Sequence, residues 1–283
     1  MIDTAIFNDI HKFPPVDTTY VAGRWHHGRV ALGGFVVEAK TYAKSLFTPY
    51  NRNRRFLIIG RARSGTTLLT RLLNEHPDIH CDGEILHRNV LLPRTFFNRM
   101  AGNSAAPVYG AKFLSYQMVQ VHRIRDPRAF LGRLADQGVS LIHLKRDTFH
   151  QTLSLLVAQR RNQYHSDEGA SKPKQKFHVA VRDFVARMTW SEALLDYERT
   201  ALQGLGATHI DYDSDLSDAT QQQATAASLF QSLGVKNVPV KAALQKVLSK
   251  DPRDTIENFD EVCRALANEG MGHLLPKEAQ YAR

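Results

Sequence analysis

A loop framed by two glycines holds the most informative chemistry of the chain. In FLIIGRARSGTTLL, residues 56–69, Gly60 and Gly65 stand where the two glycines of the phosphate-binding loop G-x-x-x-x-G-K-S/T stand. Thr66 occupies the lysine position and Thr67 the serine or threonine position. That lysine reaches the β- and γ-phosphates of a nucleotide. Its replacement predicts an anion site for a different kind of ligand.

The positive charge reappears three residues earlier, in Arg63. Backbone N–H groups at the start of the following helix bind anions with or without a lysine, because the helix dipole favours negative charge there. Ser64, Thr66 and Thr67 add hydroxyl groups. This set suits a single 5′-phosphate whose outer group is not a polyphosphate, and a nucleoside phosphosulfate has that form.

A second motif follows a later predicted strand. The stretch LIHLKRDTFHQTLSLL places Arg146 at a strand end and Ser154 eight residues later in the next predicted helix. Two helical turns separate them, so both can bind one anion only if it lies beside that helix. Taken alone, the pair could equally be a surface arginine and a serine in a helix.

Together the two motifs resemble those of the sulfotransferase family, which reads K/R-S-G-T/S-T/S before an apolar helix and carries an arginine and a serine eight residues apart. The likeness is greatest to bacterial carbohydrate sulfotransferases of the nodulation-factor type. It implies 3′-phosphoadenosine 5′-phosphosulfate (PAPS) as co-substrate and no metal. Residues 63–67 would bind its 5′-phosphosulfate, Arg146 and Ser154 its 3′-phosphate, and Tyr212, in IDYDSDL, would lie near the adenine.

The resemblance also suggests catalytic residues. NEHPDIHCDGEILH implies Glu84 as the general base, near a strand end where open α/β sheets place their ligands. His87 is the reserve base, and Lys112, in GAKFLSYQ, would neutralise a sulfuryl oxygen or hold the acceptor. Arg63 would stabilise the leaving group. The alternatives are an exposed loop glutamate and a solvated lysine, and the catalytic histidine of cytosolic sulfotransferases has no counterpart.

Sulfuryl transfer to a hydroxyl is an in-line displacement that needs positive charge around the leaving group and a base for the acceptor proton. The expected acceptor is a carbohydrate or a glycolipid. One rival interpretation is a P-loop nucleotide kinase or hydrolase with a degenerate loop, although LIHLKRD is basic where an apolar strand ending in aspartate would be needed. Another is an inert polyanion-binding protein.

Alternating strands and helices must position these residues. The sequence predicts an α/β fold, a parallel β-sheet flanked by helices, of the P-loop nucleotide-binding (sulfotransferase) type. The expected strands cover residues 56–60, 78–81, 107–114 and 139–146, with a fifth ending at residue 212. Residues 1–54 form an N-terminal extension, with a hairpin or an arm in TYVAGRWHHGRVALGGFVVEA. Residues 55–283 form a single domain with a polar loop insert at about 160–177.

The composition limits the partners. The 283 residues carry a net charge of +9, which favours anionic ligands. Motifs of nucleic-acid-binding proteins are missing from the sequence, and so is an apolar run long enough for a membrane span. A chain with two distant cysteines and a start unlike a signal peptide is expected in the cytoplasm. The oligomeric state stays open.

Overall fold

The computed structural model describes residues 26–47, 50–161, 176–241 and 251–280. These residues divide into two compact units. Unit 1 contains residues 26–145 and 194–241, and unit 2 contains residues 146–193 and 251–280. Helix α7, Val181–Leu202, contributes to both units. The predicted boundary after residue 54 and the predicted single domain from 55 to 283 stay predictions.

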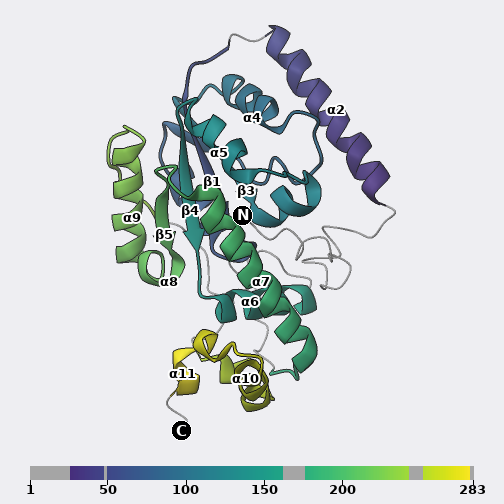
Figure 1. The fold of residues 1–283 in the computed structure, drawn as a ribbon. Helices are drawn as coiled ribbons and strands as arrows, with labels where there is room; N and C mark the ends of the chain where they lie inside the picture. Colours follow the sequence, from purple (N-terminus) through teal and green to yellow (C-terminus); the bar gives the residue numbers. More distant parts are fainter. Residues whose placement is uncertain (1–25, 48–49, 162–175, 242–250, 281–283) are drawn as a thin grey trace. The chain divides into compact units, whose positions relative to one another are not determined.

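Unit 1 is built on a five-stranded sheet in the order β2-β3-β1-β4-β5, in which every pair of neighbours is parallel. The strands are β1 Arg54–Gly60, β2 Ile79–Cys81, β3 Val108–Leu114, β4 Val139–Lys145 and β5 Thr208–Asp211. The central strand β1 is buried from residue 56 onward, as is typical of a parallel strand covered on both faces. The predicted α/β fold, with a parallel sheet and a P-loop after its first strand, is therefore confirmed (Figure 1).

Some helices of unit 1 begin at an aspartate whose side chain accepts from one of their first N–H groups. Asp126 accepts from the N–H of Ala129 at the start of α5, and Asp218 accepts from the N–H of Gln221 at the start of α9. Besides the C-terminal part of α7, the helical elements are α2 His26–Phe47, α3 Thr66–Asn74, α4 Pro93–Gly102, the π-helix η1 Gln117–Val121, α5 Pro127–Ala135, α8 Tyr212–Asp215 and α9 Ala219–Ser232. None of the helices in the described ranges is both long and apolar enough to cross a bilayer.

Helix α2 covers most of the stretch in which the sequence predicted a hairpin or an arm, so that prediction is wrong for residues 26–39, and residues 19–25 lie outside the described part of the chain. Gly34 serves packing rather than a turn. A Cβ atom on Gly34 would lie 1.9 Å from the carbonyl oxygen of Asn89, so only glycine lets the helix approach that loop so closely. Glu38 is buried and accepts from the N–H groups of Leu91 (2.8 Å) and Leu92 (3.2 Å). These contacts, distant in sequence, favour the helix over local strand preference.

Unit 2 has its own apolar core. Phe149, Phe184 and Phe259 meet there, with ring centroids 5.1 Å apart for the first two and 6.0 Å apart for Phe149 and Phe259. Besides the N-terminal part of α7, its elements are α6 Thr148–Arg161, η2 Pro252–Asp254, α10 Phe259–Asn268, η3 Gly272–Leu274 and α11 Lys277–Gln280. Most of the polar loop predicted at 160–177 lies outside the described residues, and Phe177, at its end, forms a parallel bridge with Ile256.

Candidate active site

The loop between β1 and α3 has the conformation of an anion-binding loop. It runs from Gly60 to Thr66, and Arg63 (φ 67°) and Gly65 (φ 101°) both adopt the left-handed region. Ser64 is fully buried, and its Oγ donates to the carbonyl oxygen of Arg61 at 2.6 Å. This bond holds the loop curled before α3, whose first N–H groups need partners from outside the helix. This conformation suits the anion site that the two glycines predict, and the site itself stays a prediction.

Tyr212 lies directly against this loop. A Cβ atom on Gly65 would be 2.3 Å from Cδ2 and 2.9 Å from Cε2 of the Tyr212 ring. Tyr212 is the first residue of α8, immediately after the edge strand β5. The structure thus brings Tyr212 next to the loop, and no residue other than glycine fits at position 65 without displacing the ring.

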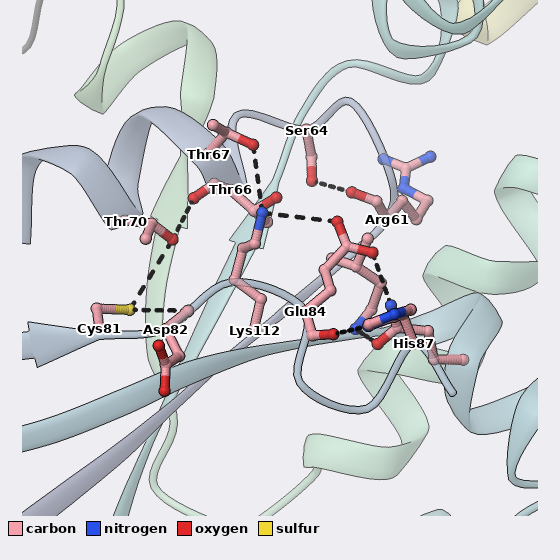
Figure 2. A network of polar contacts seen from close by, with 12 residues as sticks. Arg61, Ser64, Thr66, Thr67, Thr70, Cys81, Asp82, Glu84, His87 and Lys112 are labelled. Atoms are coloured by element: carbon pink, nitrogen blue, oxygen red, sulfur yellow. Dashed lines mark hydrogen bonds and ion pairs between the residues drawn. The ribbon is translucent and has the colours of Figure 1, made fainter. Parts of the chain in front are cut away.

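A lysine from the neighbouring strand stands beside the loop. Lys112, on β3, is 5% exposed, and its Nζ donates to Oγ1 of Thr67 at 3.3 Å. The same Nζ lies 3.6 Å from Oε1 of Glu84, so one ammonium group connects the loop helix with the candidate base (Figure 2). A buried ammonium group is stable only beside compensating charge or hydrogen bonds, and Glu84 supplies that charge. The structure brings together three residues that the sequence predicted separately.

The other oxygen of Glu84 is held by two further side chains. Nε2 of Gln117 donates to Oε2 at 2.7 Å, and the hydroxyl of Tyr116 donates to it at 3.2 Å. Gln117 is fully buried, and its Oε1 accepts from the N–H of Leu114 at 3.1 Å. One amide group thus connects the end of β3 to the carboxylate. Gln117 had no predicted role, although GAKFLSYQ shows a glutamine five positions after Lys112.

The segment that carries Glu84 is fixed by its backbone. The N–H of Lys112 donates to the carbonyl oxygen of Gly83 at 3.0 Å, which continues the hydrogen bonding between the β2 segment and β3 beyond Cys81. Nδ1 of His87 bonds to the carbonyl oxygen of Glu84. The reserve base His87 is therefore tied to the backbone of the first candidate, and its side chain is exposed.

Cys81, at the end of β2, is unsuited to nucleophilic chemistry. Burial raises the pKa of its thiol to about 12, although Thr70 and Lys112 lower it. Only a thiolate is a good nucleophile, so this thiol is inert at neutral pH. Both cysteines are free, and the described residues contain no group of three or more His, Cys, Asp or Glu side chains that could hold a metal ion.

The second predicted motif lies in unit 2. Arg146 directly follows the last residue of β4, and Ser154 is buried in the middle of α6. Asp147, between them, accepts from the N–H of His150 at 2.9 Å and so supports the start of α6. The roles of Arg146 and Ser154 in binding a phosphate stay predictions.

Residues 55–107 match the model of the sulfotransferase family. The matched part contains the phosphate loop and Glu84, while Lys112 and the later candidates lie beyond it. No curated protein matches the chain.

Two solved sulfotransferases are similar in structure. The first, from Alicyclobacillus acidocaldarius, is 13% identical over 81% of this chain and 99% of its own, with a TM-score of 0.42. The second, mouse sulfotransferase SULT7A1 complexed with PAP, is 14% identical over 87% of this chain and 95% of its own, with a TM-score of 0.44.

Proposed function

We propose that the protein is a sulfotransferase that moves the sulfuryl group of PAPS to a hydroxyl group of an acceptor. One observation carries the proposal. A phosphate loop without its lysine receives a buried ammonium group from Lys112, and this group contacts both Thr67 and Glu84. Sulfuryl transfer needs a cation to stabilise the developing negative charge and a base to remove the acceptor proton. Lys112 and Glu84, whose Nζ and Oε1 atoms lie 3.6 Å apart, can supply both. The match of residues 55–107 to the sulfotransferase model supports the same reaction.

The loop would bind the 5′-phosphosulfate. The backbone of Ser64 and Gly65 and the hydroxyls of Thr66 and Thr67 surround the start of α3, where the helix dipole favours an anion. Arg63 would stabilise the negative charge that develops on the leaving phosphate oxygen. The phosphosulfate would thus bind to hydrogen-bond donors and positive charge that this chain supplies. No metal is part of the proposal.

Glu84 would act as the base. In the transfer, a bond forms between the acceptor oxygen and sulfur while the bond from sulfur to the phosphate oxygen breaks, and the acceptor proton passes to the carboxylate. Oε2 of Glu84 is already bonded to Gln117 and Tyr116, so Oε1 is the better placed oxygen to receive the proton. Lys112, near that oxygen, would meet the sulfuryl oxygens in the transition state.

The remaining assignments concern selection of the cofactor and acceptor. Arg146 and Ser154 would bind the 3′-phosphate and so distinguish PAPS from ATP, and Tyr212 would contact the cofactor near its adenine. The acceptor is a carbohydrate or glycolipid, as in the nodulation-factor type of sulfotransferase, and the reaction takes place in the cytoplasm.

Ligand-induced stabilisation tests the proposal directly. A ligand at about 100 times its Kd raises the free energy of unfolding by about 2.7 kcal/mol. Adenosine 3′,5′-bisphosphate (PAP) should therefore raise Tm by much more than AMP or ATP does at equal concentration. EDTA should not change this result. Equal shifts with all these nucleotides would contradict the 3′-phosphate site. A larger, Mg²⁺-dependent shift with ATP would favour a nucleotide kinase.

A further inference from the structure

Exposed large apolar side chains gather on α2 and the segments that follow α2 and precede α4. Within the described ranges they are Phe35, Val36, Val37, Leu46, Phe47, Tyr50, Leu91 and Leu92. Phe47 is 86% exposed, Leu46 81% and Leu91 64%. Soluble proteins rarely concentrate apolar side chains in this way, and such patches mark contact sites for proteins or membranes.

The helical period separates this set from the packed side of α2. Gly34, Glu38 and Thr41 face the loop before α4 and α4 itself, since Glu38 bonds to the N–H groups of that loop and Thr41 contacts Met100. At 3.6 residues per turn, Val36 and Phe47 project on the side opposite to these three. We call Phe35, Val36, Leu46 and Phe47 the apolar face. Leu91 and Leu92 adjoin α2 on the side of Glu38, because their N–H groups bond to that side chain.

The exposed charged side chains of residues 33–47 and 85–102 are all positive. Lys40 and Lys44 are exposed on α2, and Arg88 and Arg99 are exposed on the neighbouring loop and helix. The only acidic residue in 33–47 and 85–102 is Glu38, which is 3% exposed. Two copies of such a surface repel each other, and a nucleic acid offers no apolar layer. Anionic headgroups above an apolar interior complement both properties of this surface.

The loop that packs against α2 also carries the candidate base. It covers residues 82–92, with Glu84 as its third residue and Leu91 and Leu92 at its end, where their N–H groups bond to Glu38 of α2. Leu92 lies eight positions after Glu84, a separation of at most about 28 Å even when the chain is fully extended. The base therefore lies one short loop away from α2, within reach of an acceptor that carries its own spacer.

We propose that the apolar face docks the protein on an anionic membrane surface, where it meets an acceptor attached to lipid. Docking follows from the face alone, whereas the nature of the acceptor rests on the proposed sulfotransferase function. In this arrangement Leu46 and Phe47 enter the boundary between headgroups and acyl chains, and the basic side chains contact the headgroups.

Co-sedimentation of the full chain with vesicles tests the docking without any cofactor. The protein should sediment with vesicles of phosphatidylcholine and phosphatidylglycerol and much less with phosphatidylcholine alone. Because each lysine near such a surface contributes about fivefold in binding, Lys40→Glu with Lys44→Glu should weaken binding by at least about 25-fold. Phe47→Ser should weaken it by about tenfold. Lys236→Glu, which removes an exposed charge elsewhere in unit 1, is the matched control and should weaken it far less.

Three results would overturn the docking proposal. The first is equal sedimentation with neutral and anionic vesicles. The second is binding that is unchanged by Phe47→Ser while Tm shows the variant folded. The third is a dimer in analytical ultracentrifugation that Phe47→Ser dissociates, which would assign the face to a second copy. A protein that binds vesicles but gives no PAP-dependent rise in Tm would refute the sulfotransferase proposal and leave the docking site intact.

Discussion

Replacing Gln117 by glutamate sets a second carboxylate against the candidate base. Nε2 of Gln117 lies 2.7 Å from Oε2 of Glu84, and the side chain is fully buried, so Gln117→Glu exchanges a donor for an acceptor of nearly the same shape. Two unit charges about 4 Å apart repel by about 4 kcal/mol at an effective dielectric constant of about 20. Lys112 offsets part of this repulsion, so we expect the pKa of the new carboxyl group to rise by about 1–3 pH units.

The expected result is a loss of stability that grows with pH. A carboxyl group whose pKa is raised by folding keeps a proton that the unfolded chain has released, so the free energy of unfolding falls as the pH rises above about 4. At about pH 7.5 the loss should reach about 1.4–4 kcal/mol. Urea unfolding of the wild type and of Gln117→Glu at about pH 4 and about pH 7.5 measures it.

Gln117→Leu is the control, because it removes the donor without adding a charge. It should cost about 1–3 kcal/mol for the hydrogen bonds that the buried partners lose, with a smaller dependence on pH. If the free energies of unfolding of the two variants differ by the same amount at both pH values, Gln117 does not contact Glu84 as it does in the structure. Under the proposed function, Gln117→Glu should also move the acidic limb of the kcat/KM profile to higher pH, because the base must be ionised to accept a proton.

Three further predictions follow from contacts described above. Gly65→Ala should destabilise the protein by about 1–3 kcal/mol in urea unfolding and abolish the rise of Tm with PAP, because the backbone of Gly65 is left-handed and the Tyr212 ring fills the space that a Cβ atom would need. Gly83→Ala is the control and should have neither effect, because the space beside Gly83 is open. Burial, with a neighbouring histidine and lysine, lowers the pKa of His209, so the folded protein should lose stability as the pH falls below about 6.5, and His209→Gln should flatten that dependence of Tm on pH. Glu84→Gln should retain PAP binding while kcat falls by about 10²–10⁴; near-normal turnover, together with an inactive His87→Asn, would reassign the base.

The strands of unit 1 were predictable because β1, β3 and β4 are short apolar runs buried on both faces, which a sequence displays directly. The order of these strands in the sheet could not be predicted, because no local sequence pattern indicates that β1 lies between β3 and β4. Helix α2 was missed for a similar reason. Its glycines look like strand breakers, and the contact of Gly34 with the loop at Asn89 involves residues 55 positions apart.

The candidate site was predictable residue by residue but not as an arrangement. Thr67, Glu84 and Lys112 each follow from a motif, yet the distances among them depend on the parallel register of Cys81 with Gly110. The contact of Gln117 depends on the π-helix that begins at this residue, an element that sequence patterns do not indicate and that often occurs at functional sites. Whether these residues perform the proposed chemistry stays a prediction.

The position of β1 at the centre of the sheet also sets the order of events during synthesis. Its register partners are Val108 for Arg54 and Val139 for Arg55, the second pair 84 residues apart. At about 5–20 residues per second, the ribosome needs about 4–17 s to add that stretch. The backbone edge of β1 that pairs with β4 remains unpaired during this interval, and Tyr212 reaches Gly65 only after 147 residues have followed that glycine. A nascent chain of this protein is therefore expected to depend on chaperones until its fourth strand has emerged.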